Sequence, residues 1–192
     1  KKWLTVAAVT MTSQTNTEAN LQTLFSFMER ASSNHVDLIV FPEVALQGCP
    51  AWGPSSYIPT AQEMAYVRQT AETIPGQSTS NLVAKAKELN VFVVFGMTEQ
   101  DTAGLLYNAN VFLGPEGVIG KHRKTFLVEN DSRIWRSGSG YAVLDSPLGK
   151  IGLMICAELW SNGNLPGPVL ARQGADLLVT SSAWWNRDAS SW

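Results

Sequence analysis

Short apolar runs that are typical of buried strands alternate along this chain with segments in which apolar residues recur at helical spacing. The strand-like runs cover residues 6–10, 36–41, 91–98, 108–113, 141–145, 151–155 and 176–182. Between the first two runs, one helical face carries Leu21, Leu24, Phe25 and Met28. A helix with one apolar face has to bury that face against another layer. The alternation therefore predicts an α/β sandwich rather than an all-α or all-β domain.

Two capping-box patterns predict where helices begin. In each, a threonine is followed three residues later by a glutamate, so the two side chains can satisfy the first free backbone N–H groups of a helix. Residues 15–18 form the first pattern and residues 60–63 form the second. We expect the second helix to end near residues 74–76, and a third helix, over residues 82–89, to end at Asn90.

Turn signals between the later strand-like runs predict antiparallel pairing. A polar turn separates the runs at 91–98 and 108–113, and a Gly-Pro-Glu-Gly turn at 114–117 then leads into Val118 and Ile119, which indicates a meander. The runs at 141–145 and 151–155 flank a Ser-Pro-Leu-Gly segment, which indicates a hairpin.

Composition excludes several classes of partner. The chain has 192 residues, of which 45% are hydrophobic, so we expect one sizeable core and a single domain over residues 1–192. The net charge is −2 and only 16% of the residues are charged, which gives no electrostatic case for binding nucleic acid or an anionic membrane surface. The apolar runs are much shorter than the roughly 20 residues of a membrane span. A small-molecule substrate is therefore a better expectation than a nucleic acid or a membrane.

The two cysteines indicate a reducing compartment. Cys49 lies in a Gly-Cys-Pro turn and Cys156 ends a strand-like run, and both positions fit free thiols better than a disulfide. The first residues also lack the apolar core and small-residue cleavage site of a signal peptide. The sequence therefore predicts a cytoplasmic protein.

Three polar residues follow strand-like runs, where a side chain meets the edge of a sheet. Glu43 comes after Phe-Pro, Lys124 ends a Lys-His-Arg-Lys segment, and Cys156 ends an apolar run. Taken singly, each has a common structural explanation: a core cysteine, a solvated loop carboxylate or an exposed basic turn. The order of the three along the chain, with Glu158 two positions after the cysteine, resembles the nitrilase superfamily of carbon–nitrogen hydrolases.

The resemblance implies a fold and a division of roles. Members form an α-β-β-α sandwich that continues beyond the point corresponding to Trp192, so the chain is expected to lack the C-terminal part of the domain. Cys156 would attack the substrate carbon to form a thioester, Glu43 would act as the base, and Lys124 would stabilise the oxyanion. The backbone N–H of Ala157 would share that last role. Burial is expected to raise the pKa of Glu43.

The resemblance assigns further positions. Members carry a second acid shortly after the lysine, and either Asp131 or Glu129 fills that place here, Asp131 being one methylene shorter than the usual glutamate. Trp184, after the last strand-like run, is either a pocket wall or a core or interface aromatic. His35 is expected to cap a helix end, and His122 to lie at the surface. No metal and no other cofactor is expected, because the sequence has no metal-ligand spacing and no nucleotide-binding loop.

The predicted function is hydrolysis of a non-peptide C–N bond in a small amide or carbamoyl compound, through a thioester on Cys156. A nitrilase that converts a nitrile to acid and ammonia with the same three residues is the alternative within the family. A non-catalytic binding or assembly module is the alternative from another class. The expected partners are a small-molecule amide or nitrile and further copies of the chain in a homo-oligomer, with no nucleic acid and no membrane.

Overall fold

The computed structural model describes residues 3–51, 56–128, 130–160 and 166–183. In these ranges the elements follow in the order β1 (Val6–Ala8), α1 (Thr17–Ser32), β2 (Leu38–Val40), α2 (Ala61–Thr70), α3 (Gln77–Leu89), β3 (Phe92–Gln100), β4 (Leu106–Gly114), β5 (Gly117–Arg123), α4 (Asp131–Ile134), β6 (Val143–Ser146), β7 (Gly149–Ile155), the 3₁₀ turn η1 (Cys156–Leu159), α5 (Pro166–Arg172) and β8 (Leu177–Ser181).

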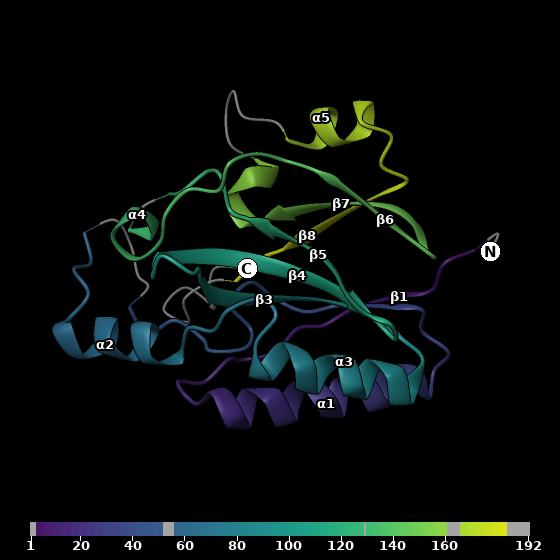
Figure 1. The fold of residues 1–192 in the computed structure, drawn as a ribbon, viewed down its shortest axis with the longest axis horizontal. Helices are drawn as coiled ribbons and strands as arrows, with labels where there is room; N and C mark the ends of the chain where they lie inside the picture. Colours follow the sequence, from purple (N-terminus) through teal and green to yellow (C-terminus); the bar gives the residue numbers. More distant parts are fainter. Residues whose placement is uncertain (1–2, 52–55, 129, 161–165, 184–192) are drawn as a thin grey trace.

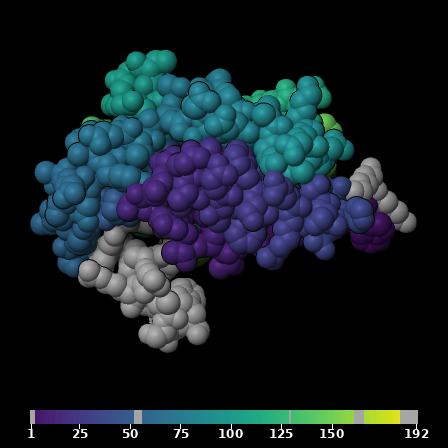
Figure 2. Space-filling model, turned by 90° about the horizontal axis from the view of Figure 1, so that it is seen from below, coloured from purple at the N-terminus to yellow at the C-terminus, as the bar shows by residue number. Residues whose placement is uncertain are grey.

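In the described part of the chain the elements stack in four layers (Figure 1). α1 and α3 lie on one face of a sheet with the strand order β1-β2-β3-β4-β5, and the other face of that sheet packs against a sheet with the order β6-β7-β8. α5 covers the outer face of the second sheet. Figure 2 shows the helical side of the molecule, where the purple atoms of α1 lie beside the blue-green atoms of α3. The predicted α-β-β-α sandwich is confirmed.

Both sheets mix parallel and antiparallel pairs. β1, β2 and β3 run parallel to one another, whereas β3, β4 and β5 form the predicted antiparallel meander. β6 and β7 form the predicted hairpin, in which Ser146 pairs with Gly149, and β8 lies parallel to β7. Because β2, β5 and β7 each precede a predicted site residue, this topology decides whether those residues meet.

Apolar side chains fill the spaces between the layers. The core between the helices and the first sheet includes Leu24 of α1, Leu82 of α3 and Phe95 of β3. The core between the two sheets includes Phe112 of β4 and Leu153 of β7. Burying a side chain of this size stabilises the fold by about 1.5–3 kcal/mol relative to leaving it in water. The sandwich is thus a well-packed support for the loops at the strand ends.

The start of α1 differs from the capping-box prediction. α2 begins with the predicted box between Thr60 and Glu63. α1 is capped instead by Asn16, whose side chain accepts a backbone N–H bond from the first turn. Glu18 bonds to a side chain one turn further along the helix, so the predicted box over residues 15–18 is wrong. Asparagine caps a helix at least as well as threonine, and it lies one position closer to this helix.

α2 also ends earlier than predicted, at Thr70 rather than near residues 74–76. Beyond it the chain is extended, and Glu72 forms a parallel bridge with Glu99 of β3, which replaces helical hydrogen bonds with strand hydrogen bonds. α3 ends at Asn90 as predicted, where the backbone is left-handed. None of the helices in the described ranges is both long and apolar enough to span a membrane.

Candidate active site

Glu43 is carried by a turn that follows β2 and crosses Gly96 of β3. The backbone N–H of Gly96 donates to the carbonyl oxygen of Pro42 at 3.2 Å, and the Gly96 carbonyl accepts from Leu46 at 3.1 Å. A Cβ atom on Gly96 would lie only 2.4 Å from the backbone nitrogen of Val44, so this close approach requires glycine. Val44 has a positive φ of 46°, which is rare for a β-branched residue. The turn places the Glu43 side chain in the interior, where it is fully buried.

Lys124 follows the last residue of β5 and meets Glu43 in the interior. Its backbone N–H donates to the carbonyl oxygen of Asn108, and its carbonyl accepts from Gly138, each at 2.8 Å. Its ammonium nitrogen lies 2.9 Å from Oε1 of Glu43 and 2.8 Å from Oδ2 of Asp131. None of these three charged side chains has exposed surface. The ammonium group therefore bridges two buried carboxylates.

Cys156 begins η1 immediately after β7. Its φ is 50°, a left-handed conformation that residues other than glycine adopt rarely and that is common at functional turns. The thiol is buried beside the carboxylate of Glu43 and lies within electrostatic range of Lys124 and Asp131. The fold thus brings the three strand-end residues together. We refer to Glu43, Lys124, Asp131 and Cys156 as the buried cluster.

Two groups that the sequence patterns did not single out hold the carboxylate of Glu43. The side chain of Asn108, in β4, donates at 2.8 Å to Oε1, the oxygen that also contacts Lys124. The backbone N–H of Ala183, just beyond β8, donates to Oε2 at 3.1 Å. Both oxygens of the carboxylate are therefore fixed, one by a donor from β4 and the other by a donor just beyond β8.

Asn110 supports the cluster from the same strand as Asn108. Residues two apart in a strand share a face, and the Asn110 side chain donates at 3.0 Å to the carbonyl oxygen of Met154 in β7. This bond joins the two sheets close to Cys156. The pattern Asn-x-Asn in an otherwise apolar strand is a sequence signal for such contacts, because a buried asparagine needs hydrogen-bond partners.

Burial and charge have opposing effects on the ionisation of Glu43 and Lys124. Burial raises the pKa of Glu43, and the nearby ammonium of Lys124 offsets only part of that effect. The sequence predicted this direction. Burial lowers the pKa of Lys124, but the carboxylates of Glu43 and Asp131 outweigh burial and hold that pKa above its ordinary value. The lysine is therefore a permanent cation, whereas the glutamate is easier to protonate than a solvated one.

The thiol of Cys156 carries its proton near neutral pH. Burial raises its pKa to about 12, and the negative charge of Glu43 acts in the same direction, whereas Lys124 lowers the pKa. Burial also raises the pKa of Cys49, the other thiol. A thiolate at Cys156 would therefore have to form during attack on a substrate, by proton transfer to a base. Glu43 is the carboxylate that contacts this thiol.

The structure describes two of the four remaining predicted site residues, Asp131 and Ala157. Asp131, at the start of α4, contacts Lys124 directly, and the backbone N–H of Val128 donates to the same Asp131 oxygen at 3.2 Å. Ala157 is buried in η1, next to Cys156. The predictions for Glu129 and Trp184 fall outside the residues that the structure describes.

His122 is buried, so the prediction that it lies at the surface is wrong. Its Nε2 lies 2.8 Å from Oε2 of Glu158, which is itself fully buried, and its ring stacks on Tyr141 with centroids 5.4 Å apart. Side chains alternate between the two faces of β5, and this places His122 and Lys124 inwards. The sequence Lys-His-Arg-Lys at 121–124 is typical of an exposed turn, so the alternation of buried and exposed side chains is hard to recognise from the sequence.

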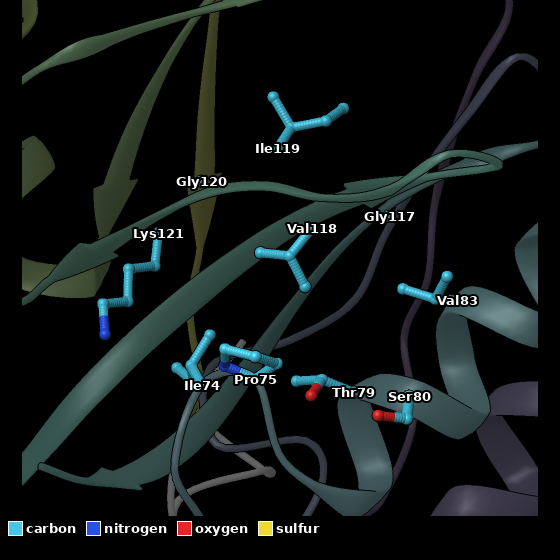
Figure 3. Close-up of a pocket in the computed structure, with 10 residues that line it drawn as sticks. All are labelled: Ile74, Pro75, Thr79, Ser80, Val83, Gly117, Val118, Ile119, Gly120 and Lys121. Atoms are coloured by element: carbon cyan, nitrogen blue, oxygen red, sulfur yellow. The ribbon is translucent and has the colours of Figure 1, made fainter. Parts of the chain in front are cut away.

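A groove of about 610 Å³ lies between α3 and β5, away from the buried cluster (Figure 3). In Figure 3, Val118 of β5 points towards Pro75, and Lys121 of β5 and Val83 of α3 lie at opposite ends of the groove. No residue of the buried cluster lines this groove. We place the candidate active site at the buried cluster, because chemistry requires convergent polar groups rather than an apolar groove.

The family of the chain follows from comparison with known proteins. The family model described as carbon-nitrogen hydrolase matches residues 5–191. The chain belongs to the carbon–nitrogen hydrolase family, and hence to the nitrilase superfamily that its sequence resembles.

Individual relatives include enzymes named for different substrates. Nitrilase 2 of Arabidopsis thaliana is 32% identical over 152 residues, which cover 74% of this chain and 44% of the plant protein. Omega-amidase NIT2 of Mus musculus is 34% identical over 134 residues, which cover 62% of this chain and 46% of the mouse protein. The chain thus spans about half the length of the curated relatives it matches.

Solved structures share the fold. Nit3 of Saccharomyces cerevisiae, a member of branch 10 of the nitrilase superfamily, matches with a TM-score of 0.75 and 25% identity over 95% of this chain and 65% of the yeast chain. An amidase of Nesterenkonia AN1 from the same superfamily matches with a TM-score of 0.77 and 18% identity over 98% of this chain and 68% of that chain. The second likeness is one of fold alone.

Proposed function

We propose that this chain is part of a cysteine-dependent hydrolase that cleaves the C–N bond of a small amide or carbamoyl compound. Glu43, Lys124 and Cys156 are its catalytic residues. One observation carries the proposal: a buried ammonium lies between two buried carboxylates, one of which contacts a buried thiol. Burying such charges costs free energy, and clusters of perturbed ionisable groups gather at functional sites.

The reaction begins with attack of the Cys156 sulfur on the substrate carbonyl carbon. As the S–C bond forms, Glu43 takes the thiol proton and the carbonyl oxygen becomes an oxyanion. The ammonium of Lys124 and the backbone N–H of Ala157 stabilise that oxyanion. Oε1 of Glu43 already accepts two bonds, from Lys124 and Asn108, whereas Oε2 accepts one, from the backbone N–H of Ala183, so we assign the proton transfer to Oε2.

Collapse of the tetrahedral intermediate breaks the C–N bond. Glu43 gives its proton to the nitrogen, ammonia or an amine departs, and the acyl group stays on Cys156 as a thioester. A water molecule then attacks the thioester carbon while Glu43 removes one of its protons, and Glu43 returns that proton to the sulfur as the acid leaves. Glu43 must alternate between its charged and neutral forms, and its raised pKa makes the neutral form accessible.

Asp131 is our choice for the second acid, with Glu129 as the alternative. The contact of 2.8 Å between Asp131 and the Lys124 ammonium supports this choice, because it would fix the direction of the remaining N–H bonds of the lysine. We also propose that Trp184 lines the substrate pocket.

A nitrilase is the second candidate for the same residues. Addition of the Cys156 sulfur to a nitrile carbon gives a thioimidate, which water converts to the thioester with release of ammonia. The relatives at 32% and 34% identity are a nitrilase and an omega-amidase, so sequence identity favours neither substrate class. The amide remains our first choice because the mechanism then needs one addition of water rather than two.

A non-catalytic binding or assembly module is the third candidate. Replacing buried charges with apolar residues of similar volume is often neutral or stabilising. A scaffold would therefore gain nothing from a thiol, a lysine and two carboxylates buried together. The composition of the buried cluster argues against this candidate.

Intact-mass measurement after incubation with a mixture of small amides and nitriles tests the proposal. We expect an acyl adduct in the parent and in Cys49→Ala, and none in Cys156→Ala. The mass of the adduct identifies the acyl group. An adduct that persists in Cys156→Ala would refute the assignment of the nucleophile.

Ammonia release from each pure substrate then separates the candidates. Release from amides supports the first choice, and release from nitriles alone supports the nitrilase. No adduct and no ammonia with any substrate would favour the non-catalytic module.

The location and assembly of the protein are further proposals. Cys49 and Cys156 are both free thiols, which supports a cytoplasmic location. Leu159 and Trp160, at and just beyond the end of η1, are 52% and 51% exposed, and this apolar surface supports a homo-oligomer. Light scattering with a charged substitution at Leu159 would test the assembly.

A further inference from the structure

Glu158 is a buried carboxylate that the proposed mechanism does not use. It lies two residues after Cys156 in η1, and its side chain has no exposed surface. An ionised carboxylate in a protein interior costs several kcal/mol unless hydrogen bonds compensate it. The hydrogen-bond partners of Glu158 therefore indicate which parts of the chain this buried carboxylate holds in place.

Four donors surround the two oxygens of Glu158. Oε1 accepts from both the backbone N–H and the hydroxyl of Thr125, each at 2.7 Å. Oε2 accepts from the backbone N–H of Ile155 at 2.7 Å and lies 2.8 Å from Nε2 of His122. Burial alone would raise the pKa of Glu158, but the bonds from His122 and Thr125 hold it below its ordinary value. Glu158 is thus an ionised acceptor at every one of these contacts.

These bonds join two segments that lie far apart in the sequence. Ile155 is the last residue of β7, so its bond to Glu158 closes the turn in which Cys156 adopts its left-handed backbone. His122 and Thr125 lie on either side of Lys124 along the chain. One carboxylate therefore connects the turn of the thiol with the strand end of the ammonium.

We infer that Glu158 is a positioning residue, which sets the distance between the Cys156 sulfur and the Lys124 ammonium in the proposed reaction. This inference rests on the proposed function and deepens it. During attack, the sulfur must approach the carbonyl carbon while the oxyanion donor lies at the carbonyl oxygen. An error in the distance between the sulfur and the donor therefore slows the chemical step. Tyr141 extends the same network, because its hydroxyl contacts that of Thr125 and its ring stacks on the ring of His122.

A carboxylate that only stabilises the fold would behave differently on mutation. Glu99 supplies the matched comparison, because its side chain is 2% exposed and it binds Lys121 and Arg123 on the opposite face of β5. Replacing either glutamate with glutamine keeps the volume but exchanges one acceptor oxygen for a donor. Both substitutions should lower stability, and only Glu158→Gln should disturb the reacting groups.

The test measures kcat, KM and the melting temperature of the parent, Glu158→Gln and Glu99→Gln with a small amide that the parent hydrolyses. We expect Glu158→Gln to lose about 10²-fold in kcat with little change in KM, the scale of a misplacement of roughly 1 Å. Glu99→Gln should lose a comparable amount of thermal stability and keep its kcat. A parental kcat in Glu158→Gln, or the same loss of kcat in both variants, overturns the inference.

Thr125→Val and Thr125→Ser give a second pair that perturbs the fold less. Valine removes the hydroxyl that donates to Oε1, whereas serine keeps it, so kcat should fall in the first variant and return in the second. If Glu158→Gln does not fold, a parental kcat in Thr125→Val overturns the inference. A parent that forms no adduct on Cys156 contradicts the proposed function itself. A parent that forms the adduct, with no effect of these substitutions on kcat, contradicts only the role of Glu158.

Discussion

Nδ2 of Asn108 lies 2.8 Å from Oε1 of Glu43, and both side chains are fully buried. This hydrogen bond favours the charged form of Glu43 and so opposes the larger effect of burial, which raises its pKa. In Asn108→Leu the pKa of Glu43 should rise further, and the ionised base should exist only at higher pH. We expect the acid limb of the kcat/KM profile to move to higher pH, with activity partly recovered on the alkaline side.

Asn110→Leu is the control for this shift. The two asparagines lie on the same face of β4, but the side chain of Asn110 bonds to the backbone of Met154 rather than to Glu43. Its replacement should lower the melting temperature and leave the acid limb where it is in the parent. Equal displacement of the limb in both variants would mean that Asn108 does not act through Glu43.

Glu43→Gln should have opposite effects on thiolate content and on turnover. The charge of Glu43 contributes to the raised pKa of Cys156, so its removal, with Lys124 still present, should bring that pKa below about 12. Titration of the ultraviolet absorbance of the thiolate, in a Cys49→Ala background, should show the variant ionising at lower pH than its parent. Turnover should nevertheless fall, because glutamine cannot accept the thiol proton. Faster thioester formation in the variant would contradict the assignment of Glu43 as the base.

The layers of the sandwich could be predicted from the sequence because they depend on local patterns. Apolar runs and helical stripes record which side of each element is buried, and a strand-end position can be read from the residues that precede it. The strand ends of Glu43, Lys124 and Cys156 are local features of this kind. Their proximity was an expectation from family resemblance, since nothing in the separate runs fixes the order of strands in the sheets.

The contacts that support the cluster could not be predicted in the same way. Asn108 and Glu43 are 65 positions apart, and their hydrogen bond depends on the register of β4 against β3. The sequence predicts the wrong environment for His122, because its charged neighbours mask the alternation of β5. The buried carboxylate that explains its position, Glu158, lies 36 positions further along the chain, in η1.

Gly96→Ala should displace Glu43 without touching its side chain. A Cβ atom at position 96 would lie 2.6 Å from the carbonyl oxygen of Pro42 and 2.7 Å from Cα of Glu43, and both of these are backbone atoms. Overpacking of this kind costs about 1–3 kcal/mol of stability, and the shift of the turn should lower kcat as well. Urea denaturation and steady-state kinetics on the same preparation would measure both effects.

Gly167→Ala is the matched control for the added methyl group. Its Cβ atom would meet only Leu178 Cδ1 at 3.7 Å, which is ordinary contact, so the added methyl group does not overpack its surroundings. Stability should fall less than in Gly96→Ala, with parental kcat. A Gly96→Ala variant that behaves like Gly167→Ala would show that the turn accommodates a side chain at this crossing.

Lys124→Met should destabilise the fold in a pH-dependent way as well as reduce kcat. Removing one oxyanion donor costs about 10²–10³ in kcat. The substitution also leaves the carboxylates of Glu43 and Asp131 buried without a countercharge, and breaking a buried ion pair costs about 3–5 kcal/mol. Burial already raises the folded-state pKa of Glu43, and loss of the ammonium, which lowers it, should raise that pKa further above its unfolded value. Such a group favours the folded state at low pH and loses that contribution as the pH rises through the folded-state pKa.

The melting temperature of Lys124→Met should therefore fall further below that of the parent as the pH increases. Lys124→Met/Asp131→Asn removes one of the two uncompensated charges, so it should recover part of the stability at high pH while its kcat stays as low as in the single variant. Thermal denaturation of the three proteins across a pH series measures both effects. A deficit that is the same at every pH, or a double variant no more stable than the single one, would show that the two carboxylates do not depend on the lysine for their burial.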